Sequence, residues 1–319
     1  MRAAVILNPR AGGGAAGRRW PSIRHEVERR LGRVEIRRTE SPGHGTTLAR
    51  ELTAAGFDPI IAAGGDGTLN EVVNGVLAVD AGTRLGVLPL ASGGDFARAL
   101  GLGGIGVALD SMAAGATRDV DAVRVRFRDA AGTTAERYCI NAASIGLGAL
   151  AARGVGGWKR VLPARVRYLA AAAPALLQRR AFQVRLRSDG GPALESSVAM
   201  VILANGGFVG AGLRLAPGAD ISDGLLEVVS VERLGLVEVS AHARLLYSGA
   251  INSHPKVSHW QARRVEVAGD CVPLELDGEP VGTLPLEAEI LLRRVRILCP
   301  LASQGRSAPA QREAHGGPA

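Results

Sequence analysis

The stretch from Pro59 to Val73 reads Pro-Ile-Ile-Ala-Ala, then Gly-Gly-Asp-Gly-Thr, then Leu-Asn-Glu-Val-Val. The apolar residues Pro59–Ala63 predict a buried strand and Leu69–Leu77 predicts a helix, so the glycines fill a tight strand-to-helix turn. Such glycines let the backbone approach a polyphosphate, and a helix N-terminus points free N–H groups at an anion. Asp66 would repel phosphate, so its expected role is to hold Mg²⁺ or its water shell. A purely structural turn with an Asp cap is the alternative.

The same alternation of strand and helix extends over residues 1–122 and predicts an α/β domain with a parallel sheet. Further strands are expected at Ala3–Asn8, Val34–Arg38 and Leu85–Leu90, and further helices at Trp20–Leu31 and Thr46–Ala55. Over residues 123–302 the apolar residues alternate with period two, which is typical of an antiparallel β-sandwich. One helical insertion, Trp158–Arg180, interrupts this domain, and its last strand is allowed to return to the first domain. Residues 303–319 are expected to form a disordered tail.

The composition narrows the choice of partners. The 319 residues carry a net charge of +8 and include 3 Trp, 3 Tyr and 5 Phe, 11 aromatic residues together. So few aromatic residues argue against nucleic acid, which proteins bind through base-stacking platforms. The positive charge fits an anionic membrane surface or a phosphorylated substrate, or it reflects an arginine-rich composition without electrostatic purpose.

The cysteine residues and the length of the apolar runs indicate the cellular compartment of the protein. Cys139, Cys271 and Cys299 are widely spaced in apolar runs, so they are interpreted as buried free thiols in a reducing compartment. The run Ala3–Leu7 is too short for a signal-peptide core, and Leu169–Leu177 is too short for a membrane span. The sequence therefore predicts a soluble, cytoplasmic protein, and peripheral association with the inner membrane face stays open.

A second glycine cluster, Gly12–Gly17, competes as a phosphate-binding loop. It satisfies the G-x-G-x-x-G pattern of dinucleotide-binding folds, and Glu35 lies at roughly the distance of a ribose-binding acid. One match is weak evidence in a chain with 43 glycines. The acid is also expected at the end of the second strand, whereas Glu35 falls inside it.

The segment Ala62–Val72 resembles the nucleotide loop of the diacylglycerol kinase catalytic domain family, which includes soluble bacterial lipid kinases and the sphingosine and ceramide kinases. NAD kinases and phosphofructokinases share a looser G-G-D-G, so this loop alone does not distinguish among these families. Other segments of the sequence are needed to choose among them. These follow the family order: Asn8–Gly12, Thr39, Leu88–Arg98, Val120-Asp121, Asn141–Gly146, Asn205–Leu213, Ala216–Ala219, Asp223–Leu226 and Asp277–Glu279. The resemblance implies an NAD kinase/phosphofructokinase-like nucleotide domain followed by the β-sandwich.

The resemblance also implies site residues and cofactors. Glu279 would be the general base that takes the proton of the acceptor hydroxyl, and Asp66, with Asp95, would organise ATP and Mg²⁺. The nucleotide contacts would be Asn8, Thr39, Gly64, Gly65, Asp66, Gly67, Thr68, Asn70, Ser92 and Asp95. A structural Mg²⁺ would be held by the Asp223 carboxylate and the carbonyls of Asp220 and Leu225. From the residues alone, the alternative for Glu279 is an exposed residue of a β-hairpin. The alternative for the metal-binding loop is a solvated acidic turn.

Three positions depart from the family pattern. Ala91 replaces a Gly and Gly94 replaces an Asn, while Gly13 stands where many soluble bacterial members carry a Lys. Arg18 or Arg19 would take the place of that Lys. These departures bear on substrate choice more than on the type of reaction.

The predicted function is transfer of the γ-phosphoryl group of ATP to a hydroxyl of diacylglycerol or a similar lipid at a membrane surface. The alternatives are an NAD kinase-like or other small-molecule kinase, and a regulatory protein that binds lipid or nucleotide with weakened catalysis. The basic segment Trp158–Arg180 is either a membrane-contacting helix or an ordinary surface helix. The sequence does not determine which lipid is used or whether the chain forms a homodimer.

Overall fold

The computed structural model describes residues 2–79, 82–91, 94–155, 164–178 and 180–300. Its N-terminal part contains four strands that pair in parallel: β1 (Ala4–Leu7), β2 (Glu35–Arg38), β3 (Ile60–Gly64) and β4 (Leu85–Pro89). Every residue of β1 and β3 is buried, as expected for short apolar strands covered on both faces. Because the strands are parallel, their carboxyl ends meet at one edge of the sheet.

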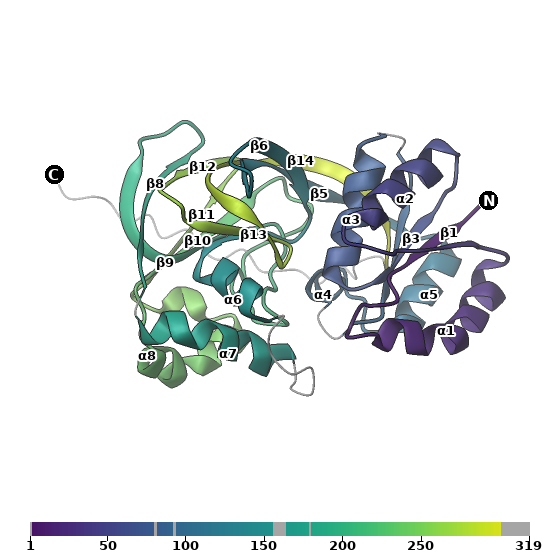
Figure 1. The fold of residues 1–319 in the computed structure, drawn as a ribbon, viewed down its shortest axis with the longest axis horizontal. Helices are drawn as coiled ribbons and strands as arrows, with labels where there is room; N and C mark the ends of the chain where they lie inside the picture. Colours follow the sequence, from purple (N-terminus) through teal and green to yellow (C-terminus); the bar gives the residue numbers. More distant parts are fainter. Residues whose placement is uncertain (1, 80–81, 92–93, 156–163, 179, 301–319) are drawn as a thin grey trace.

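Helices cover both faces of this sheet (Figure 1). α1 (Ala15–Leu31) packs with α5 (Ile105–Ala114), and α2 (His44–Ala54) packs with α3 (Asp66–Leu77). α3 begins at Asp66 instead of the predicted Leu69, because Gly65 in an extended conformation precedes the first turn. The sequence analysis placed no helix at α5 or at the five-residue α4 (Asp95–Ala99).

The C-terminal part is built from antiparallel strands around a second core. The strands are β5 (Thr117–Asp129), β6 (Thr134–Cys139), β7 (Ala142–Gly146), β8 (Phe182–Ser188), β9 (Leu194–Ala204), β10 (Leu226–Glu232), β11 (Val257–Ala262), β12 (Arg264–Ala268), β13 (Pro273–Leu276) and β14 (Glu279–Leu298). The period-two pattern is present: Val123, Val125 and Phe127 of β5 are buried in this core, while Arg126 between them is exposed.

β5 and β14 connect the two parts. The strand order is β11-β10-β9-β7-β13-β14-β4-β3-β1-β2. The last strand in the sequence, β14, therefore joins the parallel sheet of the N-terminal part. The end of β14 pairs in parallel with β4, with Ile297 opposite Leu85. Val120 of β5 and Val295 of β14 are buried in the N-terminal core, whereas Val125 and Leu286 are buried in the C-terminal one. A two-stranded ribbon therefore fixes one domain against the other.

The helical insertion expected at Trp158–Arg180 is present as α7 (Ala164–Leu177), but the second domain contains further helices that were not expected. The structure also contains α6 (Leu147–Val155), α8 (Leu236–Ala241), α9 (Ala243–Ser248) and a 3₁₀ turn at Ile251–Ser253. α8 and α9 have six residues each, too few for a helical period to stand out in the sequence. Residues 156–163, 179 and 301–319, which include part of the predicted insertion and the predicted tail, lie outside the described residues. In the part described, no helix is long and apolar enough to cross a membrane.

The cysteine prediction needs one correction. Cys139 and Cys299 are buried free thiols, but Cys271 is exposed. Cys271 lies in the turn between β12 and β13 and has a positive φ of 52°, so the apolar residues that follow it belong to the next strand. An apolar neighbour in sequence was therefore a poor guide to burial at this position.

Candidate active site

The carboxyl edge of the parallel sheet brings together residues that are far apart in sequence. Asn8, Thr39 and Gly64 stand at the ends of β1, β2 and β3. The Asn8 amide donates a hydrogen bond to Thr68 Oγ1 at 3.0 Å, which links the β1 loop to the first turn of α3. A Cβ on Gly64 would lie 2.4 Å from the same Thr68 Oγ1, so only glycine fits there. In open α/β sheets, ligands bind at this edge.

The first glycine cluster forms part of the same edge. Gly12, Gly13 and Gly14 all have positive φ angles, and Gly14 precedes α1. Glu35 begins β2, so it lies at the opposite end of that strand from Thr39. The structure therefore contradicts the dinucleotide interpretation, which needs the acid at the carboxyl edge.

Asp66 lies in the first turn of α3 and anchors α4. Its carboxylate accepts hydrogen bonds from the backbone N–H groups of Asp95 at 3.0 Å and Phe96 at 3.4 Å. Burial, followed by the nearby Asp95 carboxylate, raises the pKa of Asp66 from 3.8 to about 6. These bonds explain why a five-residue helix starts at Asp95: they satisfy its first two backbone donors.

Asp95 links the two domains. It is buried, and its carboxylate accepts a hydrogen bond from the backbone N–H of Ala211 at 2.8 Å and from Arg98 Nη1 at 2.5 Å. Burial raises the pKa of Asp95, while the bond from Ala211 and the Arg98 charge oppose this shift. Asp66 and Asp95 are thus adjacent acidic groups beside the glycine-rich loop, as the sequence predicted.

Glu279 reaches the glycine-rich loop from the other domain. It is the first residue of β14, and a Cβ placed on Gly67 would lie only 2.5 Å from Glu279 Oε1. Arg137 Nη2 is 3.6 Å from Glu279 Oε2. Burial raises the pKa of Glu279, and the charge of Arg137 opposes the shift. The carboxylate proposed as a base and the loop proposed for phosphate are therefore in contact.

Asp277 is the most extensively hydrogen-bonded carboxylate of this region. Its oxygens accept hydrogen bonds from five donors: the backbone N–H groups of Ile140, Asn141 and Ala142, the Cys139 thiol and the Asn70 amide. Asn70 is buried and also donates to the Tyr138 carbonyl at 2.9 Å. The described contacts of Asn70 thus join α3 to the second domain, and its expected nucleotide contact stays a prediction.

Sequence reasoning missed two residues that shape the site. Arg137 of β6 faces Glu279 and donates to the Asn70 oxygen at 3.0 Å. Glu71 accepts hydrogen bonds from the backbone N–H groups of Gly43 and Gly45, both at 2.8 Å, and so holds the N-terminus of α2. Glu71 follows directly on the glycine-rich loop and could have been noticed there. Arg137 stands on an ordinary alternating strand, and only strand pairing shows its position.

The predicted metal loop is held to β5 by a buried carboxylate of that strand. Asp121 is fully buried and accepts a hydrogen bond from Gly224 N at 2.7 Å. Asp223 accepts one from Leu225 N at 2.9 Å, and its pKa is raised by burial and by Asp220 and Asp121. Arg118 lies 2.9 Å from the Asp220 carboxylate. Among the described residues there is no cluster of three His, Cys, Asp or Glu side chains suited to a metal, so the Mg²⁺ prediction rests on one carboxylate and two carbonyls.

The positions that depart from the family pattern fit the backbone of the loop. Ala91 packs its methyl group near Gly65, whose added Cβ would lie 3.1 Å from it. Gly94 adopts a left-handed φ of 63°, a conformation that glycine and asparagine tolerate best, so the backbone is kept although the side chain is lost. The exposed Arg18 lies beside the loop, with its Nη1 3.5 Å from the Gly13 carbonyl. Ser92 lies outside the described residues.

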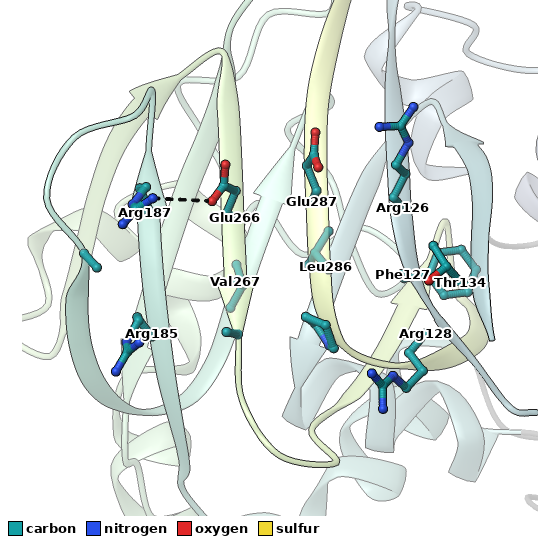
Figure 2. Close-up of a pocket in the computed structure, with 13 residues that line it drawn as sticks. Arg126, Phe127, Arg128, Thr134, Arg185, Arg187, Glu266, Val267, Leu286 and Glu287 are labelled. Atoms are coloured by element: carbon teal, nitrogen blue, oxygen red, sulfur yellow. Dashed lines mark ion pairs between the residues drawn. The ribbon is translucent and has the colours of Figure 1, made fainter. Parts of the chain in front are cut away.

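A separate cavity of about 440 Å³ lies on the outer face of the sandwich (Figure 2). The charged side chains that line it are Arg126, Arg128, Arg185, Arg187, Glu266 and Glu287. Glutamates pair with three of its arginines: Glu136 with Arg126, Glu195 with Arg185 and Glu266 with Arg187. None of the predicted site residues lines this cavity, so it is not the site described above.

The parallel strands end in glycine-rich loops, and Glu279 of the β-sandwich contacts one of these loops, so the chain is a two-domain α/β and β-sandwich protein. The family models agree with this class. Residues 2–125 match the diacylglycerol kinase catalytic domain, and residues 141–299 match the YegS C-terminal NAD kinase beta sandwich-like domain. The chain belongs to the diacylglycerol kinase catalytic domain family.

Relatives and solved structures show the same two-domain arrangement over most of the chain. A diacylglycerol kinase of Bacillus subtilis (strain 168) is 28% identical over 302 residues, which cover 94% of this chain and 96% of that protein. A crystal structure of a diacylglycerol kinase from Bacillus anthracis str. Sterne has a TM-score of 0.68 at 20% identity and covers 94% of this chain and 97% of that one. An NAD kinase from Archaeoglobus fulgidus in complex with ATP has a TM-score of 0.50 at 15% identity and covers 93% of each chain.

Proposed function

We propose that this chain transfers the γ-phosphoryl group of ATP to the hydroxyl group of diacylglycerol or a similar lipid. The observation that carries the proposal is the contact between Glu279 and Gly67, which brings a carboxylate of the second domain to the N-terminus of α3. The family and the names of its relatives support the kinase activity and ATP as phosphoryl donor.

The glycine-rich loop would bind the phosphates. The first backbone N–H groups of α3 have no partner within the helix, and the helix dipole favours an anion at this end. Gly64, Gly65 and Gly67 carry no side chain that would keep a phosphate away. Thr68 and Asn8 hold the loop to the sheet through their mutual hydrogen bond.

Glu279 would act as the general base. The acceptor hydroxyl gives its proton to the Glu279 carboxylate while its oxygen forms a bond to the γ-phosphorus and the bond to ADP breaks. Burial raises the pKa of Glu279, which makes its carboxylate a better proton acceptor. Arg137 limits this rise and orients the carboxylate.

Asp66 and Asp95 would hold a Mg²⁺ ion with the nucleotide. The residues fit such an ion, because the Asp66 and Asp95 carboxylates lie close together, and burial, followed by the charge of Asp95, raises the pKa of Asp66. Oxygen ligands of carboxylates are those that Mg²⁺ prefers. When bound, the ion would neutralise charge on the phosphates.

The acyl chains would lie near α6, α7 and α8, which gather below the sandwich (Figure 1). Ala151 of α6 and Ala172 and Leu176 of α7 form a small apolar cluster there. Leu177 at the end of α7 is 68% exposed, and Val237 of α8 is 84% exposed. Exposed apolar side chains beside a helical cluster suit contact with a lipid surface.

The test is phosphorylation of diacylglycerol in mixed micelles with ATP and Mg²⁺, followed by mass analysis of the lipid products. Wild-type protein should form the phosphorylated lipid, and Glu279→Gln should lower kcat by about 10²- to 10⁴-fold while nucleotide binding is retained. Glu289→Gln is the matched control, because Glu289 lies on the same strand and also pairs with an arginine, Arg124, but away from the loop.

Two results would refute the proposal. Phosphorylation of NAD⁺ without any lipid product would favour the NAD kinase-like alternative. A wild-type protein that binds lipid or nucleotide without turnover, with Glu279→Gln unchanged from it, would favour the regulatory alternative.

A further inference from the structure

Glu275 is a buried carboxyl group to which the proposed mechanism gives no role. It lies on β13, two residues before Asp277, and only 3% of its surface is exposed. Its strand neighbours Leu274 and Leu276 are buried in the sandwich core, so Glu275 faces the opposite side of the sheet. Helix α6 packs against β13. A carboxyl group in such a place needs a specific partner.

The partner of Glu275 is the turn that carries Glu279. The backbone N–H of Gly278 donates a hydrogen bond to Glu275 Oε2 at 2.5 Å. Asp277 and Gly278 both have positive φ angles, 49° and 86°, and Leu276 pairs with Glu279 across them. These features define a two-residue hairpin turn of type I′. Glu275 thus fixes the peptide unit between Asp277 and Gly278, one residue before Glu279.

The surroundings of Glu275 favour its uncharged form. Burial raises the pKa of Glu275 from 4.5 to about 8, and the carboxylates of Asp277, Asp95 and Glu279 add to this shift, whereas the bond from Gly278 opposes it. Arg153 of α6 does not neutralise it, because its described bond is to the Gly282 carbonyl. Burial therefore favours the protonated form of Glu275 at neutral pH.

Strand register places a second unpaired polar group beside Glu275. Ser144 of β7 stands directly opposite Glu275 in the antiparallel ladder. The Ser144 hydroxyl is fully buried and has no hydrogen-bond partner within the described part of the chain. Directly opposite side chains in such a ladder have Cβ atoms about 5 Å apart, so Ser144 is a neighbour of Glu275, although no hydrogen bond joins the two described side chains.

We propose that Glu275 is a positioning residue for Glu279: its hydrogen bond to Gly278 clamps the Asp277–Gly278 turn and so holds the Glu279 carboxylate against Gly67. This inference rests on the proposed function. Ionisation of Glu275 would add a negative charge beside Asp277 and Glu279 in a buried region. The turn would then open toward water, and Glu279 would move away from Gly67.

Glu275→Gln and Glu275→Ala separate this role from a merely structural one. Glutamine keeps the acceptor for Gly278 and the uncharged state, so Glu275→Gln should keep kcat within about twofold of wild type at pH 7. Wild-type kcat should fall by about fivefold between pH 7 and pH 9, and this loss should be absent from Glu275→Gln. Glu275→Ala should lower kcat about tenfold at pH 7 with KM for ATP unchanged.

Glu195→Gln is the control, because Glu195 is an exposed strand glutamate paired with Arg185. It should leave kcat and its pH profile unchanged. Retention of the alkaline loss in Glu275→Gln, or full kcat in Glu275→Ala, would overturn the proposal.

Two measurements without catalysis keep the inference testable should the lipid kinase proposal fail. A group whose pKa is raised by folding stabilises the protein below its unfolded pKa, and this stabilisation is lost as pH rises through the folded pKa. The Tm of Glu275→Gln should therefore rise relative to wild type between pH 5 and pH 8. Hydrogen exchange over residues 276–284 should be faster in Glu275→Ala and unchanged in Glu275→Gln. Unchanged exchange in Glu275→Ala would overturn the clamp whether or not the protein phosphorylates lipid.

Discussion

The half-buried Asp66 and the buried Asp277 are two acids of one candidate site, but they are anchored differently. Asp66 accepts two backbone hydrogen bonds from residues 29 and 30 positions away in the sequence. Asp277 accepts five hydrogen bonds from donors 135 to 207 positions away. The first is a short-range anchor within the nucleotide domain, and the second is a long-range anchor between strands β6, β7 and β13 and helix α3.

This difference in hydrogen bonding predicts different roles for the two acids. Two hydrogen bonds do not offset the burial of Asp66 and its proximity to Asp95, so its pKa rises to about 6 and its carboxylate would gain from a cation. Five donors occupy the lone pairs of Asp277, which leaves little room for a ligand. We therefore expect a ligand to change the behaviour of Asp66 and a mutation of Asp277 to change the fold of the site.

The largest effect is expected from Asp277→Ala. The change leaves buried donors without acceptors and frees the turn that carries Glu279. The free energy of unfolding should fall by about 3 kcal/mol, and kcat should fall by about 10²-fold or more. Urea unfolding at pH 7 and the lipid phosphorylation assay measure the two effects.

Asp129→Ala is the matched control for Asp277→Ala. Asp129 also accepts hydrogen bonds in a hairpin turn, from Ala131 and Thr133, but it is exposed and its donors are local. It should lower the free energy of unfolding much less than Asp277→Ala does and leave kcat unchanged. Equal losses in both variants would show that the number and burial of donors do not distinguish the two acids.

Gly67→Ala should break the contact between the two halves of the site without unfolding them. The new methyl group would meet the Glu279 carboxylate at 2.5 Å, and this flexible side chain can move aside. Displacement of a base by about 1 Å should lower kcat by about 10²-fold with little change in Tm. Gly106→Ala in α5 is the control, because nothing lies within 4 Å of its added Cβ. Wild-type kcat in Gly67→Ala would contradict the placement of Glu279.

Asp66→Asn tests the charge of the short-range anchor. The pKa of Asp66 is raised by folding, so its stabilising contribution is present below pH 3.8 and is lost as pH rises through about 6. Without metal or nucleotide, the variant should gain about 2 kcal/mol of stability relative to wild type between pH 4 and pH 8. Thermal unfolding across this range, in a chelator, measures the difference. A difference that stays constant with pH would show that Asp66 does not titrate in this window.

The smallest effect is expected from Asn8→Ala. The variant loses the hydrogen bond to Thr68 Oγ1, which is one of the links between the β1 loop and α3. Loss of one such bond should lower the free energy of unfolding by about 1 kcal/mol and weaken ATP binding several-fold. Isothermal titration calorimetry with an ATP analogue measures the change in nucleotide affinity. Asn252→Ala, whose amide bonds to the remote Glu227, should leave ATP binding unchanged.

The sequence by itself determined the elements whose evidence is local. The apolar run before Gly64 predicted β3, period two predicted the sandwich strands, and the order of motifs gave the family. The family resemblance also grouped Asp66 with Asp95, and the two lie close together in the structure. Short elements such as α4, α8 and α9 escaped prediction because five or six residues do not show a helical period.

Only the tertiary structure decided which residues meet across the two domains. β14 carries Glu279 at one end and joins β4 at the other, and this register brings the carboxylate to Gly67. The five donors of Asp277 and the burial of Glu275 likewise depend on how β7 and β13 align. Sequence spacing does not encode such contacts, because strand pairing sums many weak interactions over both domains before any one carboxylate finds its partners.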